Sequence, residues 1–571
     1  MTVLQKRLLS VVLAITFIFF IIAARLFYVQ VIWGRELVMR ASDQWNREIP
    51  VVAARGLIYD RNGTVIAGNT QSYAVFARPN AVGDKAYAAA MLAPLLGQDE
   101  GAVLKKLHKS GVSEVTLARQ TGRAAVEGII SLGIDGIYYS PDTSRAYAYG
   151  DALCQVLGFT SSDGLGLSGI EKVYNDVLSG IDGSILYSSD IVGNLTDGTD
   201  IVYREAVDGD GIMLTIDIDI QLVAEQAVRR VCLSSGAESA SCIVLDPNSF
   251  EVLAMVNYPS YDLNDIPRDE PEVLNSLSRN TIVCDIYEPG STFKVVTAAA
   301  NLQEYLNGNT AAFSPTYIFN GSRTRSVDGT TIRCWSDHAN GKHSSQTLAL
   351  ALNNSCNPCF TDIALALGTD VFYDYLTLFG LGNVTGIDFA GEALGMLVPQ
   401  SLVRDCDLAR IGFGQTVAVT GLQLACAVAS AVNGGNYYVP SLARGVVSKD
   451  GSVEELSPVL KNTTISERAS AMLCEMLEGV VAEGSGKNAY IEGYRVAGKT
   501  GTAQKYENGA VAQGKYVSSF VGFFPANEPR YLALVIVDEP QGAYYGSVVA
   551  APVAAEIFNG IISVKNIPSV E

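Results

Sequence analysis

The hydrophobic pattern begins with a long apolar segment near the N-terminus. Residues 8–24 contain no charged side chain, and apolar residues resume after Arg25. This segment is long enough to cross a lipid bilayer as a helix, with Arg25 reaching the outer interface. Two basic residues precede it, which places the N-terminus inside. We therefore predict a cytoplasmic tail at residues 1–7 and a transmembrane anchor at residues 8–33, with the remainder exported.

A cleaved signal peptide is the main alternative for this segment. Its apolar region is usually shorter, and small side chains precede its cleavage site. A cut after Ala23 or Ala24 would place an isoleucine three residues before the cut. We therefore favour an uncleaved anchor.

After the anchor, shorter patterns predict a region with many strands. Residues 57–59 and 64–67 indicate two strands that flank a turn at residues 60–63. Residues 87–107 carry apolar side chains at helical spacing and indicate a helical inserted subdomain. We expect residues 34–205 to form a region that takes no part in catalysis.

From about Gly211 the pattern indicates a second domain. Its predicted elements are a strand at residues 212–218, an amphipathic helix at 219–231, a hairpin of strands at 240–246 and 252–257, two late strands at 517–524 and 531–537, and a terminal helix at about 548–562. Helical segments lie between the hairpin and the late strands. This order indicates a mixed α/β domain built on an antiparallel sheet.

The composition of the chain argues against several classes of protein. The 571 residues carry a net charge of −19, and no basic patch stands out, so a nucleic-acid partner is not expected. The only histidines are His108, His338 and His343, which argues against a Ser-His-Asp hydrolase. The ten cysteines are irregularly spaced and do not indicate a disulfide framework.

The strongest candidate for chemistry is Glu-Pro-Gly-Ser-Thr-Phe-Lys at residues 288–294. Pro289 and Gly290 break the chain, and an apolar run follows, so Ser291 is predicted at a helix N-terminus with Lys294 one turn along the same face. A serine needs a base that takes its proton, and a lysine can serve only when it is neutral. Burial and a nearby cation both lower the pKa of a lysine.

Alone, a serine three residues before a lysine is a weak signal, because an N-cap serine with a solvated lysine gives the same pattern. Two further motifs follow in order. Ser355-Cys356-Asn357 lies in a polar break between two helical runs, and Lys499-Thr500-Gly501-Thr502 begins a predicted strand.

The order S-x-x-K, S-x-N, K-T-G resembles the signature of the penicillin-recognising serine enzymes. Residues 55–63 also resemble the motif that opens the pedestal region of class B penicillin-binding proteins, and the stretches around Arg145 and Glu171 match the same region. These pedestal residues are expected to hold structure rather than to react. The chain thus resembles a class B penicillin-binding protein of the division or sporulation type, a monofunctional D,D-transpeptidase of peptidoglycan synthesis.

The resemblance implies an α/β fold and a domain order. A penicillin-binding-protein or serine β-lactamase-like transpeptidase domain, with an antiparallel sheet and a helical region, is expected at residues 206–571. A mainly β pedestal domain of the dimerisation type is expected at residues 34–205, after one transmembrane helix. The resemblance implies no cofactor.

The resemblance also implies roles for the first two motifs. The substrate is a peptidoglycan stem peptide that ends in D-Ala-D-Ala. Ser291 attacks the carbonyl between the two D-Ala residues, and Lys294 takes the hydroxyl proton. Ser355 relays a proton towards the leaving amine, and Asn357 binds the substrate peptide.

The third motif is expected to bind the terminal carboxylate of the substrate. Lys499 attracts this group and helps to hold Lys294 neutral, while Thr500 and Thr502 bind it through their hydroxyls. Gly501 lets the strand approach the substrate closely. The backbone N–H groups of Ser291 and Thr502 are expected to form the oxyanion hole.

Other functions remain open at this stage. A membrane-anchored β-lactam sensor or a D,D-carboxypeptidase would use the same acylation step, and a catalytically silent scaffold of wall synthesis would not label with penicillin. The middle motif argues against a β-lactamase of the S-x-V type. The expected partners are stem peptides, β-lactams, wall-synthesis proteins and a separate membrane glycosyltransferase, because the region between anchor and pedestal is too short to contain one.

Two cysteines near the active-site motifs have two interpretations. Cys334 and Cys356 are either small buried residues or a redox pair whose disulfide would displace Ser355 or Asn357. A zinc site is a further alternative, with ligands from Cys334, Asp337, His338 and His343 and from Cys356 and Cys359 downstream. Because this spacing matches no standard site, no metal is predicted, and a flexible border of the active site is preferred.

Overall fold

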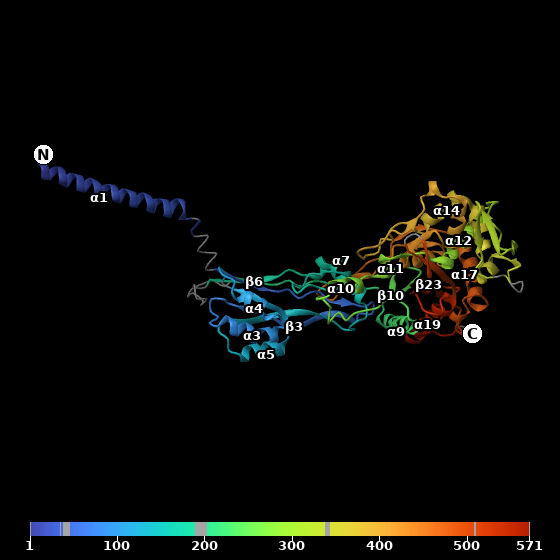
Figure 1. The fold of residues 1–571 in the computed structure, drawn as a ribbon, viewed down its shortest axis with the longest axis horizontal. Coiled ribbons are helices and arrows are strands. Elements are labelled where there is room, and N and C mark those ends of the chain that lie inside the picture. The colour runs from blue at the N-terminus through green and yellow to red at the C-terminus, as the bar shows by residue number, and fades with distance from the viewer. Residues whose placement is uncertain are drawn as a thin grey trace. The chain divides into compact units, whose positions relative to one another are not determined.

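The computed structural model describes residues 2–34, 36–37, 46–112, 114–188, 202–336, 338, 343–507 and 510–569. The chain divides into two compact units, which are coloured by residue number in Figure 1. The smaller unit comprises residues 1–54 and 180–209, and the larger unit comprises residues 55–179 and 210–571.

The smaller unit contains the predicted anchor. Helix α1 (Val3–Phe27) continues into a π-helical turn at Tyr28–Ile32, and none of its residues is buried. Together they are long and apolar enough to cross a membrane. The same unit holds a three-stranded antiparallel sheet in the order β1 (Asn46–Val51), β6 (Gly183–Ser188), β7 (Val202–Arg204).

One sheet of the larger unit is assembled from three distant parts of the sequence. Its seven strands are β20 (Val453–Glu455), β19 (Ala443–Val447), β8 (Gly211–Leu214), β2 (Ile58–Tyr59), β3 (Val65–Ala77), β4 (Val115–Thr121) and β5 (Ile137–Tyr147). Strands β2 and β8 are parallel. The long strand β3 pairs with both β4 and β5. The predicted turn between β2 and β3 is confirmed: the Asp60 carboxylate accepts hydrogen bonds from the N–H groups of Asn62 and Thr64.

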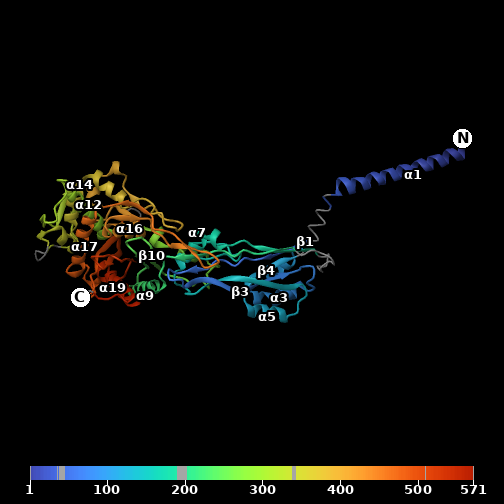
Figure 2. The same ribbon diagram turned by 180° about the vertical axis from the view of Figure 1, so that it is seen from behind.

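The helical segment predicted at residues 87–107 is two helices, α3 (Lys85–Leu96) and α4 (Glu100–Leu107). Gly97 ends α3 in the left-handed region at φ +62°, and the Asp99 side chain then caps α4. With α5 (Arg123–Ser131) they pack beside β3 and β4 around their own core, as Figures 1 and 2 show.

Residues of the pedestal motifs form a buried ionic network. Glu171 is fully buried and accepts hydrogen bonds from Arg55 Nε and Arg145 Nε, each at 2.6 Å. Arg55 also donates to the backbone oxygens of Gly164 and Glu171, and Arg145 donates to that of Gly56. The network ties the start of β2 to the end of β5 and to α7 (Gly169–Val173).

The second sheet carries the predicted K-T-G strand at its edge. Its five antiparallel strands are β10 (Val252–Tyr258), β9 (Ser239–Leu245), β24 (Tyr531–Asp538), β23 (Ala510–Phe524) and β22 (Ala497–Glu507). The predicted hairpin and both late strands are confirmed, although β23 begins earlier than expected.

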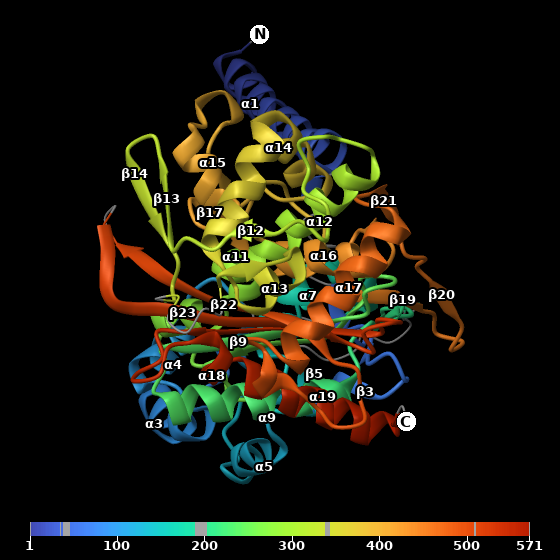
Figure 3. The same ribbon diagram turned by 90° about the vertical axis from the view of Figure 1, so that its right-hand side faces the viewer.

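Helices cover both faces of this sheet, as Figure 3 shows. Helices α9 (Ile218–Ser235) and α19 (Ala551–Lys565) pack on one face, and α12 (Lys294–Leu306), α16 (Gly421–Val432) and α17 (Glu467–Ala482) lie on the other. Along β24, Leu532 and Leu534 enter the core beneath α12 and α16, whereas Ala533 and Val535 enter the core beneath α9 and α19. This two-residue alternation is why both faces require cover.

The segment between β10 and β22 supplies the rest of the helical region. Besides α12, α16 and α17, it includes α13 (Leu348–Asn353), α14 (Asn357–Leu378) and α15 (Asp405–Ile411). Its short strands form the pairs β12 (Phe319–Asn320) with β15 (Ser345–Gln346), β13 (Thr324–Val327) with β14 (Thr330–Arg333) and β18 (Asn436–Tyr438) with β21 (Leu460–Thr463), and the sheet β11 (Ile286–Tyr287), β17 (Val417–Thr420), β16 (Met396–Leu397). The remaining short helices are α6 (Cys154–Leu157), α8 (Asn175–Leu178), α10 (Pro271–Leu277), α11 (Thr281–Cys284) and α18 (Gly546–Val549).

Candidate active site

Ser291 lies in a tight turn that leads into a buried helix. The turn is a 3₁₀ helix at Gly290–Phe293, and α12 begins only at Lys294, so the helix start differs from the predicted one by one turn. Gly290 has φ +56°, and its N–H donates to Gly414 O at 2.9 Å. A Cβ atom there would lie 3.1 Å from Thr502 O, so glycine lets the turn approach β22.

Lys294 is fully buried, and its amine lies at the centre of the site. The Nζ atom lies 3.1 Å from Ser291 Oγ, 2.8 Å from Ser355 O, 3.1 Å from Ser355 Oγ and 2.7 Å from Asn357 Oδ1. The carbonyl and amide oxygens can only accept hydrogen bonds. A neutral amine can donate its two protons to them and keep its lone pair for the Ser291 hydroxyl.

Ser355 joins the two lysines of the site. It lies between α13 and α14 with φ +53°, a conformation that few residues other than glycine adopt. Its Oγ is 3.1 Å from Lys294 Nζ and 2.9 Å from Lys499 Nζ. The next residue but one, Asn357, begins α14 and donates from Nδ2 to Arg333 O at 3.2 Å. The unusual backbone thus directs the hydroxyl between two amines.

Lys499 lies on β22 and is as deeply buried as Lys294. Its Nζ also donates to Thr500 O at 3.1 Å. Burial lowers the pKa of Lys294 to about 8. Burial and the neighbouring Lys294 lower the pKa of Lys499 well below its usual range. Two ammonium groups this close repel each other, so the site disfavours the state in which both are charged.

The residues after Lys499 make different contacts. Thr500 Oγ1 lies 3.3 Å from Ser485 Oγ, and Thr502 Oγ1 accepts a hydrogen bond from Gly546 N at 3.0 Å. A Cβ atom on Gly501 would come within 3.0 Å of Pro289 O. The glycine therefore lets β22 pack against the turn that carries Ser291, a packing role beside the predicted approach to substrate.

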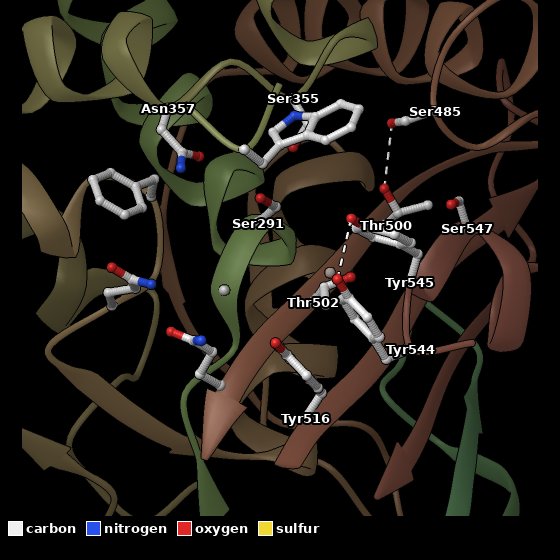
Figure 4. Close-up of a pocket in the computed structure, with 16 residues that line it drawn as sticks. Ser291, Ser355, Asn357, Ser485, Thr500, Thr502, Tyr516, Tyr544, Tyr545 and Ser547 are labelled. Carbon is white, nitrogen blue, oxygen red and sulfur yellow. Dashed lines mark hydrogen bonds between the residues drawn. The ribbon is translucent and has the colours of Figure 1, made fainter. Parts of the chain in front are cut away.

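A pocket of about 460 Å³ opens above these groups, and Figure 4 shows its lining. Six of the predicted residues line it: Ser291, Ser355, Asn357, Thr500, Gly501 and Thr502. The amines of Lys294 and Lys499 lie behind this lining, in contact with the Ser355 hydroxyl. The structure therefore brings all eight predicted catalytic and substrate-binding residues to one place.

Several lining residues are not among the predicted catalytic and substrate-binding residues: Trp335, Phe413, Gln415, Ser485, Gln504, Tyr516, Tyr544, Tyr545 and Ser547. The rings of Tyr516 and Tyr544 stack with centroids 4.0 Å apart, and they line the side opposite Asn357 in Figure 4. Two signals could have indicated some of them: the glycines on both sides of Ser485, and the tyrosine pair in a glycine-containing loop.

Sulfur and imidazole groups gather directly behind the S-x-N motif. Cys334 Sγ and Cys356 Sγ are 4.0 Å apart, and both residues are free thiols. His338 and His343 join them in one cluster whose ligand atoms all lie within 4.8 Å of one another. Asp337, a further candidate ligand from the sequence, lies outside the described residues, and Cys359 is not part of this cluster.

Two family models match the chain. The penicillin-binding protein transpeptidase domain matches residues 240–559, and the penicillin-binding protein dimerisation domain matches residues 50–214. The first match alone covers more than half of the sequence and includes all three catalytic-type motifs.

Curated relatives match along almost the whole length. Stage V sporulation protein D of Bacillus subtilis is 36% identical over 97% of this chain and 85% of its own length. Peptidoglycan D,D-transpeptidase FtsI of Escherichia coli is 30% identical over 95% of this chain and 89% of its own length.

Solved structures share the fold. A peptidoglycan synthetase from Bifidobacterium adolescentis has a TM-score of 0.73 and 26% identity, covering 92% of this chain and 98% of that one. Penicillin-binding protein 3 from Mycobacterium tuberculosis, complexed with aztreonam, has a TM-score of 0.70 and 25% identity over the same shares. With both domain models matched and relatives of this similarity along the whole chain, the protein belongs to the class B penicillin-binding proteins.

Proposed function

We propose that this protein is a serine D,D-transpeptidase that cross-links peptidoglycan stem peptides and is acylated by β-lactams. The observation that carries the proposal is the hydrogen-bonded chain Ser291–Lys294–Ser355–Lys499 at the floor of an open pocket. A nucleophile beside a buried base is the arrangement that covalent catalysis needs. Membership of the class B family supplies the substrate class, a stem peptide that ends in D-Ala-D-Ala.

The first chemical step is acylation of Ser291. Its Oγ bonds to the carbonyl carbon between the two D-Ala residues, while its proton moves to the lone pair of neutral Lys294, 3.1 Å away. The C–N bond then breaks. Ser355 passes a proton to the departing amine, and Lys294, 3.1 Å from its hydroxyl, returns the proton that it took.

The threonines of β22 account for substrate binding. Thr500 and Thr502 line the pocket beside Ser485 and supply hydroxyls for the terminal carboxylate. Lys499 stands behind them and adds the attraction of a cation when it is charged. The N–H groups of Ser291 and Thr502 are assigned to the oxyanion, and Asn357 to the substrate peptide.

The acceptor decides the reaction. An amine from a neighbouring stem that attacks the acyl-enzyme forms the cross-link and frees Ser291, whereas attack by water gives a carboxypeptidase. The relatives named for sporulation and for D,D-transpeptidation support the first outcome, with a role in wall synthesis during division or sporulation.

The N-terminal segment fits a membrane anchor with an inward N-terminus. Helix α1 is exposed along its whole length, and Lys6 and Arg7 lie at its start. We therefore place residues 1–7 in the cytoplasm, residues 8–33 in the membrane, and the pedestal (34–205) and transpeptidase (206–571) domains outside. A separate membrane glycosyltransferase would polymerise the glycan.

Fluorescent penicillin tests the nucleophile directly. The detergent-solubilised full chain should label covalently and release the label slowly, and Ser291→Ala should not label. Ser547→Ala is the matched control, since it removes a hydroxyl from the far side of the same pocket and should keep labelling. Labelling of Ser291→Ala would move the nucleophile elsewhere, and rapid release would indicate a β-lactamase.

A second assay separates the transpeptidase from its alternatives. With a D-Ala-D-Ala stem peptide and an amine acceptor, the wild-type protein should form a cross-linked product that is absent for Ser291→Ala. Release of D-Ala without cross-linking would indicate a carboxypeptidase. Penicillin labelling without any peptide turnover would indicate a sensor, and absence of labelling would indicate a scaffold.

A further inference from the structure

We propose that Cys334, His338, His343 and Cys356 bind a structural zinc ion that fastens the S-x-N motif in place. One ligand atom from each residue lies within 4.8 Å of all the others. Tetrahedral zinc with bonds of about 2.0–2.3 Å places its ligand atoms about 3.3–3.8 Å apart. Two of the atom pairs, Cys334 Sγ–Cys356 Sγ and Cys356 Sγ–His338 Nε2, are both 4.0 Å apart, so small movements would complete the site.

The backbone holds the two sulfurs on separate, well-fixed elements. Cys334 directly follows β14, and its N–H donates to Arg323 O at 2.9 Å. Cys356 is the N-cap of α14, and its N–H donates to Ala351 O at 2.9 Å. Both side chains are buried. The two thiols thus meet because the hairpin β13–β14 packs beside α14.

The orientation of His338 is the one a metal ligand requires. Its Nδ1 is 2.9 Å from Gly321 O, and a carbonyl oxygen can only accept, so Nδ1 carries the proton. In the neutral ring, Nε2 then has a free lone pair, and this atom faces Cys356 Sγ. A backbone carbonyl that fixes the ring in this way is a common outer partner of zinc-bound histidine. The residue holds this position with φ +58°, an uncommon conformation outside glycine.

His343 would supply the fourth zinc ligand. The His343 ring is buried and stacks on His338 with centroids 4.1 Å apart. Two sulfur and two nitrogen ligands in tetrahedral reach select zinc over magnesium or calcium, which prefer oxygen. Four protein ligands leave no open position, so the ion would be structural, and the reaction proceeds on Ser291 as proposed above.

Charge balance favours zinc at this place. Zinc with two thiolates and two neutral imidazoles has no net charge, so it adds no cation beside two buried lysines. The other candidate cluster among the described residues consists of three carboxylates, those of Glu238, Asp538 and Glu539. There Lys505 contacts both Asp538 and Glu539 at 2.8 Å, and this ammonium already supplies the positive charge.

The position of Cys356 connects the proposed zinc site to catalysis. It stands between Ser355 and Asn357, both of which contact Lys294 Nζ. A zinc ion on Cys356 would hold this segment to the end of β14 and so fix the hydroxyl that joins the two lysines. Misplacement of a catalytic group by about 1 Å can cost about a hundredfold in rate. The ion is therefore expected to speed acylation without touching substrate.

Metal content tests the ligand set without relying on activity. The reduced full chain in detergent, equilibrated with zinc and desalted, should retain about one zinc ion per chain by mass spectrometry. Cys334→Ser and His343→Ala should retain less than about a tenth of that. Cys359→Ser is the matched control, a buried thiol one turn along α14, and should retain zinc. Absence of zinc from the reduced wild-type chain, or loss in Cys359→Ser alone, would overturn the site.

Cobalt gives a second readout that does not depend on how well a variant folds. The cobalt-loaded wild-type chain should show the intense visible bands of tetrahedral coordination and a thiolate charge-transfer band. An octahedral spectrum would contradict the proposed ligands.

Acylation tests the fastening role separately from the identity of the enzyme. Chelation should slow fluorescent-penicillin acylation by about tenfold to a hundredfold, and added zinc should restore it. An unchanged rate would overturn the fastening role. If even the zinc-loaded protein fails to label, the proposed function fails instead, while the zinc measurement stands.

Cys334 and Cys356 are also the two residues for which the sequence predicts a possible disulfide. Zinc-bound thiolates are not available for a disulfide, so the two states exclude each other. In the zinc-free chain, an added azo-type thiol oxidant would take two electrons and two protons from Cys334 and Cys356 as the S–S bond forms. With zinc bound, peptide mapping should show no Cys334–Cys356 link, and a link formed equally fast with zinc present would overturn the shared site.

Discussion

The larger unit contains two buried clusters of ionisable side chains that differ in whether the cations have an anionic partner. In the pedestal network, the Glu171 carboxylate lies 2.6 Å from both Arg55 and Arg145, so each cation has an anion beside it. In the active site, Lys294 and Lys499 share a serine hydroxyl, and their hydrogen bonds go to hydroxyl, amide and carbonyl oxygens. The first cluster is compensated, and the second is not.

The difference explains what each cluster can do. A buried carboxylate with two guanidinium partners holds three distant segments together. A buried amine without an anion is driven towards its neutral form, because burial and a second cation both penalise its charge. The active site thus gives up stability to obtain a base at moderate pH, a common exchange at catalytic sites.

The largest effect is expected when the compensated cluster is broken. Glu171→Gln keeps the shape but leaves two buried guanidinium groups without an anion. We expect the free energy of unfolding to fall by about 3–5 kcal/mol, measured as a lower midpoint of thermal or denaturant unfolding. Protein that remains folded should still label with penicillin, because the network does not reach the pocket.

Glu127→Gln is the control for this prediction. Glu127 also pairs with an arginine, Arg123 at 2.8 Å, but both side chains are more than half exposed. An exposed pair of this kind contributes about 0.5 kcal/mol or less. Equal losses for the two variants would show that burial does not distinguish the ionic network from a surface pair.

The second prediction removes charge from the uncompensated cluster. Lys499→Met keeps most of the side-chain length and removes the amine. Acylation by penicillin should slow by about 10²–10³-fold, comparable to loss of one preorganised donor. The unfolding midpoint should stay the same or rise, because a buried amine without an anion is lost. The stability change is thus opposite in sign to that of Glu171→Gln.

Lys505→Met tests whether any lysine of β22 would give this result. Lys505 lies on the same strand, is partly exposed and is paired with Asp538 and Glu539. Its loss should leave acylation unchanged. A marked fall in the stability of Lys499→Met would contradict the view that Lys499 is held at a cost.

Much of the site was predictable because each motif is short and local. Ser291 and Lys294 are three residues apart, so a single helical turn sets their distance whatever the rest of the fold does. The order of three motifs then pointed to the family. The sheet was predictable for a similar reason, since β9, β10 and β24 are apolar runs bounded by turn residues.

Other features depend on contacts that the sequence does not display. Tyr544 and Ser485 reach the pocket only because their loops follow β24 and α17, and Gly501 owes its role to a turn more than 200 residues away. The sequence predicts no zinc site, because the spacing of these cysteines and histidines matches no standard site. It pairs Cys334 with Cys356 only as possible redox partners, and the folded chain adds His338 and His343 to that pair.

The smallest expected effect is on the pH dependence of acylation, which shows which of the two lysines is protonated. The active form of Lys294 is the neutral amine, and its pKa lies at about 8. Below that pH the amine is protonated and cannot accept the Ser291 proton. The acylation rate of the free enzyme should therefore rise about tenfold per pH unit below 8 and level off above it.

Lys499→Met turns this profile into a measurement of the coupling between the two amines. If Lys499 is charged in the wild type, its removal relieves repulsion on Lys294 and makes protonation easier. The pKa of Lys294 should then rise, and the midpoint of the rate profile should shift to higher pH, on top of the general slowing. Negative charge on the nearby thiols Cys334 and Cys356 would raise the same pKa, so both proteins are compared in the same metal-loaded state. The measurement is the second-order acylation rate between pH 5.5 and 10 at constant ionic strength. An unshifted midpoint would mean that Lys499 is neutral in the free enzyme, and that burial alone keeps Lys294 ready to act as the base.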